Sequence, residues 1–183
     1  MSVTQTQQVK VPEGTWKSDP VHSTASLEVV HNGISTFRGQ VKDFDATVHA
    51  GDDGSLAIEG AARIESIAVD EEGLYGHLLS PEFFDTARFP EVRFRSTDVA
   101  EEGDGLVVRG ELQIRDSVRE VEARGQVGGV AVGPDGSERT SLRLETTIDR
   151  TEFGLGWNME LPDGDVVLAN DVRLIVELEL VKE

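Results

Sequence analysis

A strict alternation of apolar and polar side chains constrains the fold of this chain more than any other feature. This period of two is that of a β-strand with one buried face. Residues 92–97 read as a shorter strand of the same kind. The longer alternating runs are residues 56–64, 106–114, 121–127, 142–148 and 172–180. The chain is therefore predicted to be all-β.

Turn sequences separate the predicted strands and indicate antiparallel hairpins. Gly- and Asp-rich turns occur at 51–54, 101–105, 133–136 and 162–165. Within 34–49 the apolar residues change parity, which predicts a β-bulge near Lys42 or Asp43. About eight strands, each with one apolar face, can close into an up-and-down barrel or stack as a sandwich.

Small residues at inward positions favour a barrel around a cavity, because a sandwich core is filled to close-packed density. Small residues also complement large neighbours or ease strand bending, so both interpretations stay open. The positions are Gly39, Gly60, Ala62, Gly110, Ala123 and Gly125.

Length and composition limit the functional classes. A chain of 183 residues fits one domain, predicted at 13–183 after a flexible polar tail at 1–12. Asp and Glu number 35 against 17 Lys and Arg, and the net charge of -18 disfavours nucleic acid as a partner. The absence of cysteine excludes disulfides and thiolate sites. The start has no signal-peptide pattern and no apolar stretch reaches membrane-spanning length, which predicts a cytoplasmic protein without an integral membrane segment.

An aromatic insert at 78–90 interrupts the strand pattern and holds three of the seven phenylalanines. Ser80 suits the N-cap of a short helix and Pro81 its first position, so a helical lid is predicted near 80–87. Pro90 ends the segment. A helix this short needs an apolar surface to cover, which predicts an apolar interior beneath it.

Three blocks of the chain resemble the YceI-like polyisoprenoid-binding family. They are 14–31 with the following Phe37-Arg38-Gly39, the run 77–97 that contains SPEFFDTARFP, and DRTEFGLGWN at 149–158. The resemblance covers nearly the whole chain. It implies an eight-stranded antiparallel, lipocalin-like barrel that holds a long isoprenoid chain, and commonly a homodimer. The chain departs from the family at Leu74-Tyr75, where Arg-Asp is usual, and at Arg115-Asp116, where His-Gly is usual.

An isoprenoid needs apolar length rather than reactive groups, since each buried methylene contributes about 0.8 kcal/mol before ordering costs. Each apolar candidate is also a candidate for ordinary core packing. The residues predicted to line the barrel are Phe37, Val41, Leu112, Ile114, Leu144, Val176 and Leu178. Those predicted near its mouth are Leu78, Phe83, Phe84, Phe89, Phe94, Phe153 and Trp157.

Polar candidates for the ligand's head group are His22, His31 and Arg150. Arg150 suits a phosphate or ketone oxygen, and equally suits bracing of the long loop that follows it. The four histidines form no known ligand motif, so no metal site is predicted. Without a Gly-x-Ser-x-Gly elbow no catalytic residue is assigned.

The predicted function is non-enzymatic binding of an isoprenoid lipid or quinone-like amphiphile, with no cofactor. Two alternatives remain at this point. One is an isomerase or hydrolase that acts on a lipid-like substrate in the same pocket. The other is a stress or interaction protein whose barrel is filled by its own side chains.

Overall fold

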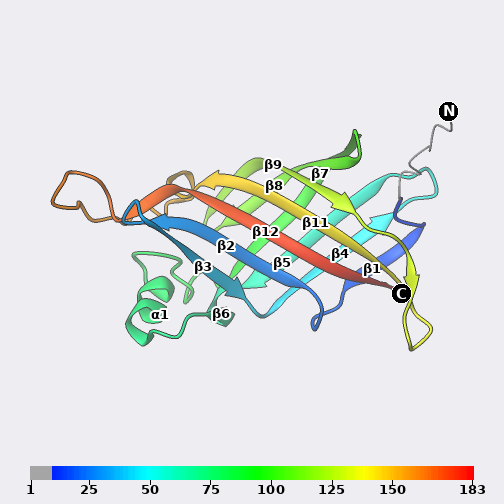
Figure 1. The fold of residues 1–183 in the computed structure, drawn as a ribbon, viewed down its shortest axis with the longest axis horizontal. Helices are drawn as coiled ribbons and strands as arrows, with labels where there is room; N and C mark the ends of the chain where they lie inside the picture. Colours follow the sequence, from blue (N-terminus) through cyan, green and yellow to red (C-terminus); the bar gives the residue numbers. More distant parts are fainter. Residues whose placement is uncertain (1–9) are drawn as a thin grey trace.

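A computed structural model, which describes residues 10–183, shows a closed antiparallel β-barrel (Figure 1). Each strand of the ring pairs with the next, and the last pairs with the first. The predicted eight-stranded antiparallel barrel is confirmed. In ring order the strands are β1 (Gly14–Ser18), β4 (Phe44–Ala50), β5 (Leu56–Arg63), β7 (Glu91–Glu102), β8 (Gly105–Ile114), β9 (Ser117–Val127), β11 (Glu138–Asp149) and β12 (Leu168–Lys182).

A further hairpin widens one end of this barrel. The hairpin consists of β2 (Thr24–His31) and β3 (Ser35–Val41), and β2 pairs with the first part of β12. On its other edge β3 pairs only with the short β6 (Ile67–Ala68), at Gln40 and Val41. The rest of that edge has no strand partner among the described residues, and α1 lies close to it (Figure 1).

The β-bulge predicted near Lys42 or Asp43 is wrong, because two separate strands meet there. β3 pairs with β2 and β6, whereas β4 pairs with β1 and β5. The amide of Asp43 donates to Ser66 Oγ at 2.7 Å and that of Lys42 to the Ser66 carbonyl at 3.1 Å. The parity of the apolar residues changes because the chain turns from one pair of neighbours to another.

The short helix lies earlier than the predicted 80–87. Helix α1 spans Glu72–Leu79 and ends at Ser80, whose hydroxyl donates to the His77 carbonyl at 2.7 Å. Pro81 then follows a helix end rather than a helix start. Residues 80–90 continue as turns without a second helix. The remaining short elements are η1 (Ile64–Ser66), β10 (Ala131–Val132) and η2 (Arg150–Phe153).

One end of the barrel, here called the closed end, is filled by a packed apolar cluster. Its central side chains have a relative exposure of 0% and come from β1, β4, β8 and β12: Trp16, Val48, Val108 and Leu180. Val11 packs into the same cluster, and Trp16 Nε1 donates to the Pro12 carbonyl at 2.8 Å. Val11 and Pro12, which were predicted to belong to the tail, therefore contact the barrel core, while residues 1–9 of the predicted tail lie outside the described part of the chain.

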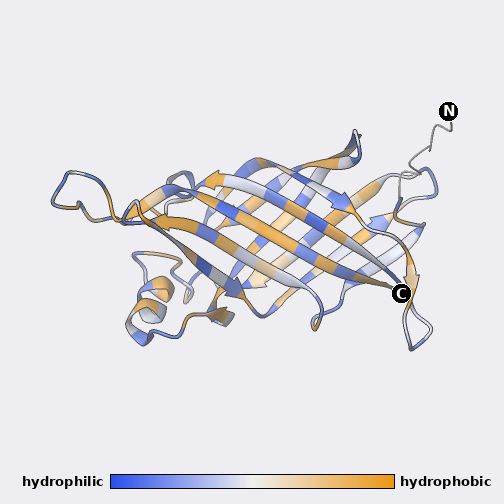
Figure 2. Cartoon of the chain, in the orientation of Figure 1, coloured by the Kyte–Doolittle hydropathy of each residue, from blue (hydrophilic) through white to orange (hydrophobic). Residues whose placement is uncertain are grey.

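Two of the small inward residues are needed for close approach of neighbouring strands. A Cβ at Gly125 would lie 1.8 Å from the Arg143 carbonyl oxygen, and one at Gly110 would lie 2.5 Å from that of Arg95. These glycines let the strands come together around the barrel, which is the bending role considered for them. Figure 2 shows the alternation of apolar and polar residues along the strands.

No helix among the described residues is long and apolar enough to cross a membrane.

Candidate functional site

The end of the barrel opposite the closed end contains a cavity of about 590 Å³, within the range of roughly 300 to 1,000 Å³ that ligand pockets occupy. The burial of the inward residues along β12 shows where the cavity lies. Leu178 and Leu180 are buried, but Leu174 and Val176, which also face inward, are only half-buried. They are half-buried because they border this space.

The segment 72–90, here called the lid segment, covers this end of the barrel. Leu78 on α1 and Phe83 and Phe84 in the following turns are buried and line the cavity. Ring centroids lie 5.6 Å apart between Phe83 and Phe84. The Phe83 ring also lies 6.3 Å from that of Trp157, on the loop before β12. The lid segment and this loop together form an aromatic wall.

Hydrogen bonds hold the turns of the lid segment in place. The amide of Phe84 donates to the Leu78 carbonyl at 3.0 Å. Arg115, in the turn between β8 and β9, donates from Nη1 to the carbonyls of Phe83 at 3.2 Å and Gly154 at 3.0 Å. Arg115 therefore ties the lid segment to the turn after η2.

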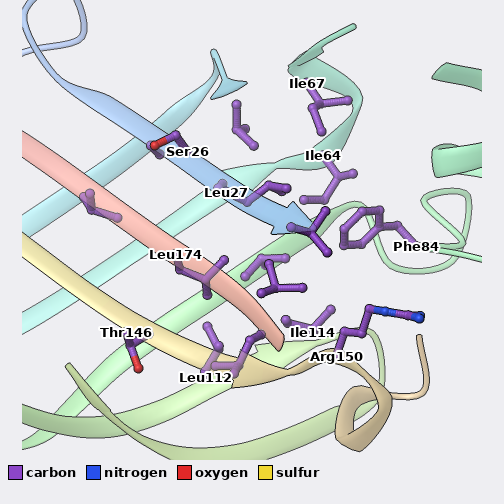
Figure 3. Close-up of a pocket in the computed structure, with 18 of the residues that line it drawn as sticks. Ser26, Leu27, Ile64, Ile67, Phe84, Leu112, Ile114, Thr146, Arg150 and Leu174 are labelled. Carbon is purple, nitrogen blue, oxygen red and sulfur yellow. The ribbon is translucent and has the colours of Figure 1, made fainter. Parts of the chain in front are cut away.

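The cavity brings together most of the apolar residues predicted from the sequence. Figure 3 shows Phe84, Leu112 and Ile114 among the side chains that line it. Phe89 and Phe153 do not border it: Phe153 is 1% exposed in the neighbouring core, and Phe89 lies under the Arg88 guanidinium. The predicted residues that line it are Phe37, Val41, Leu78, Phe83, Phe84, Phe94, Leu112, Ile114, Leu144, Trp157, Val176 and Leu178.

Sequence reasoning missed the wall contributed by β2 and by the segment after β5. On β2 the lining residues Ala25, Leu27 and Val29 occur at every second position, as expected for one face of a strand. This alternation would have identified them if residues 24–31 had been assigned as a strand. No comparable signal marks the segment after β5. The missed lining residues include Ala25, Leu27, Val29, Ile64, Ile67, Leu74 and His77.

Arg150 braces the loop before β12. Its Nε donates to the Ala169 carbonyl at 2.9 Å and its Nη2 to that of Leu168 at 3.2 Å. Its Nη1 donates to the carbonyls of Leu155 and Trp157. Burial lowers the pKa of this guanidinium. Figure 3 shows the side chain directed away from the apolar cluster, and the contacts match the bracing role.

The histidines lie in different places. His22 is exposed at the closed end, away from the cavity, whereas His31 borders the cavity at the other end of β2. His77 was not among the predicted head-group residues, yet it borders the cavity with its ring 4.5 Å from that of Trp157. Its Nε2 is buried without a hydrogen-bond partner and lies 3.5 Å from Glu82 Oε2.

The ligand atoms of Asp19, His22 and Glu179 lie within 4.8 Å of one another at the closed end. Arg139 already occupies this cluster, because its Nη1 lies 3.0 Å from Asp19 Oδ2 and 2.6 Å from Glu179 Oε1. The Val21 amide and then Arg139 hold the pKa of Asp19 well below its usual value. A guanidinium between the two carboxylates makes this an ion-pair network rather than a metal site.

Comparison with known proteins agrees with this geometry. The model of the YceI-like domain matches residues 16–180. The chain belongs to the YceI-like family. A UPF0312 protein of Staphylococcus aureus (strain USA300) is 29% identical over 164 residues, which is 88% of this chain and 94% of that protein.

Two solved structures of low sequence identity share the fold of this YceI-like chain. Burkholderia cenocepacia BcnA has a TM-score of 0.76 at 18% identity and covers 91% of this chain and 99% of its own. A polyisoprenoid binding domain from Saccharophagus degradans, described as implicated in plant cell wall breakdown, has a TM-score of 0.64 at 10% identity. It covers 92% of this chain and 98% of its own.

Proposed function

We propose that this protein binds a long-chain isoprenoid lipid, of the polyprenyl or quinone type, in the barrel cavity and thereby sequesters or carries it. The observation that carries the proposal is the cavity of about 590 Å³, walled almost entirely by aliphatic and aromatic side chains. Membership of the YceI-like family and the fold shared with a polyisoprenoid binding domain support it.

The binding energy in this proposal comes from apolar burial. Each methylene moved from water into the cavity contributes about 0.8 kcal/mol, against which stand the costs of association and of ordering a flexible chain. The aromatic side chains at the mouth, Phe83, Phe84 and Trp157, then close over the end of the ligand. We propose that the lipid enters beside the edge of β3 where residues 35–39 have no strand partner within the part of the chain that the structure describes.

We propose binding rather than catalysis. Among the described residues that line the cavity, no hydrogen bond joins two titratable side chains. His77 Nε2 lies 3.5 Å from Glu82 Oε2 at the cavity but makes no hydrogen bond to it, so this pair is not assembled as a hydrogen-bonded acid–base pair. The filled-barrel alternative requires an interior without space, and the cavity disagrees with it. The predicted cytoplasmic location and homodimer stay predictions, and light scattering of the purified protein tests the dimer.

Mass spectrometry of an organic extract of the purified protein tests the proposal, and a co-purified prenyl lipid is the expected result. Titration with prenyl lipids gives a second readout, because Trp157 borders the cavity whereas Trp16 lies in the closed end. We expect the tryptophan emission to change in the wild type and in Trp16→Phe, but not in Trp157→Phe. A clean extract together with no binding of added prenyl lipid contradicts the proposal.

A further inference from the structure

The cavity wall offers no free cation within the described part of the chain. Arg150 is the only arginine or lysine among the described lining residues. All three of its side-chain nitrogens already donate to backbone carbonyls of the loop that it braces. An anionic ligand group entering the cavity would have to take these donors from the carbonyls and leave the carbonyls unsatisfied.

The carboxylates near the cavity do not place a negative charge inside it. Asp45 and Glu59 are among the residues of the wall, but both are exposed and lie on strands whose inward positions are Ala46 and Ile58. Glu145 is likewise at an outward position, where Arg143 and Arg173 lie 2.7 and 2.9 Å from its Oε2. Among the described arginines, lysines and carboxylates of the wall, Arg150 is therefore the one charged residue that is not at an outward position, and it is fully engaged.

A phosphate or diphosphate head group drawn into this cavity would lose its hydration without gaining an opposite charge. Transfer of an unpaired ion from water into an apolar site is far more costly than transfer of a hydroxyl or ketone. The mouth also carries the Glu82 carboxylate, 3.5 Å from His77 Nε2, and the chain as a whole has a net charge of -18. Both repel an anion at the entrance.

The cavity wall suits an uncharged ligand oxygen, such as that of a hydroxyl or ketone, better than a phosphate. His77 borders the cavity, and its Nε2 makes no hydrogen bond. A neutral imidazole offers one donor and one acceptor, which suits a single hydroxyl or ketone oxygen. A phosphate group, with several acceptor oxygens and two negative charges, needs the cluster of free donors that this wall lacks.

We propose that the cavity selects isoprenoids with an uncharged hydroxyl or ketone head group and discriminates against the phosphorylated forms of the same chain. This inference rests on the proposed isoprenoid binding and narrows the class of ligand.

Geranylgeraniol and geranylgeranyl diphosphate test the inference, because they share one hydrocarbon tail and differ only in the head group. Affinities measured by calorimetry are expected to favour the alcohol by about tenfold or more, since an unpaired buried charge costs more than one such factor. Equal affinities, or tighter binding of the diphosphate, overturn the inference. If neither lipid binds and the organic extract is clean, the proposed function itself fails.

Salt separates selection by the cavity from repulsion by the surface. At about 1 M salt the Debye length falls to roughly 3 Å, so repulsion by distant carboxylates is screened whereas the cost of desolvation remains. We expect the preference for the alcohol to persist at high salt. A preference that disappears there assigns the selection to surface charge and overturns the inference.

A lysine placed at the mouth gives a matched test. Leu74 on α1 is half-buried and borders the cavity, so a long side chain at this position reaches both the cavity and water. Leu74→Lys is expected to strengthen diphosphate binding by several-fold and to reduce the preference for the alcohol. Leu74→Gln, which is polar but uncharged, is expected to leave the preference in place. If the two variants behave alike, the missing cation is not what excludes phosphate, and the inference fails.

Discussion

The two ends of this barrel use the same strands and the same alternation of residues but reach opposite packing. At the closed end the inward side chain of Leu180 on β12 has a relative exposure of 0%. Leu174, which lies earlier on the same strand, also faces inward, but it is only half-buried because it borders the cavity. The difference teaches that an inward apolar residue contributes to stability at one end and to a ligand surface at the other.

Leucine-to-alanine substitutions at the two ends sharpen this comparison most. Leu180→Ala removes a fully packed side chain, so we expect the free energy of unfolding to fall by about 2 to 5 kcal/mol. Leu174→Ala removes a side chain that already faces space, so we expect a loss of roughly 1 kcal/mol or less. Urea unfolding followed by circular dichroism measures both. Equal losses would show that the cavity is not present in solution.

Alanine-to-phenylalanine substitutions should have opposite consequences at the two ends. Ala50 lies in the packed cluster of the closed end, and overpacking there is expected to cost about 1 to 3 kcal/mol of stability. Ala25 borders the cavity, so Ala25→Phe should leave stability nearly unchanged. It should weaken prenyl-lipid binding by about tenfold or more, because the ring occupies ligand volume. Undiminished lipid binding by Ala25→Phe would place the lipid elsewhere.

Arg115→Met tests how firmly the lid segment is held. The substitution removes the hydrogen bonds to the carbonyls of Phe83 and Gly154 but keeps an apolar stem. We expect a loss of about 1 kcal/mol in stability and a several-fold faster release of bound lipid. Stopped-flow measurement of Trp157 emission reports the release. Arg119→Met, on the exposed part of β9, is the control, and an identical effect there would contradict the role of Arg115.

The smallest expected effect concerns acid stability at the closed end. The pKa of Asp19 is lowered in the folded state, so its contribution to stability is present above the ordinary aspartate value and is lost as the pH falls below about 4. Asp19→Asn should therefore flatten the decline of the melting temperature below about pH 4. Asp116→Asn, in the exposed turn after β8, should retain the wild-type slope. A wild-type slope in Asp19→Asn would show that this ion-pair network does not stabilise the fold.

The alternation of residues predicted the barrel because each strand carries its own signal. In β8 the predicted inward residues Leu106, Val108, Leu112 and Ile114 are all buried. Alternation fails where the backbone is irregular. β7 was predicted only over 92–97, since the register of its pairing with β8 shifts between Ser96 and Asp98 and reverses the parity beyond that point.

The helix could not be placed from its sequence for a local reason. α1 reads EGLYGHLL, and its two glycines and weak periodicity give little helical signal. The Glu71 side chain caps its start by accepting from the amides of Gly73 and Leu74. Ser80 and Pro81 fit either the beginning or the end of a helix, and the packing of Leu78 and Phe84 against the barrel decides for the end.

The amino-acid sequence by itself determined which side chains face inward, because strand parity is a local property of the backbone. It also determined that most of those side chains are apolar. Whether the inward side chains meet or leave a cavity was decided by the tertiary structure, through the staggered pairing of β12 with β1 and β2. The engagement of Arg150 by four carbonyls was decided in the same way. The cavity depends on distances between strands that are far apart in the chain, and the Arg150 contacts depend on how the loop before β12 folds back on η2. Strand periodicity carries no information about either.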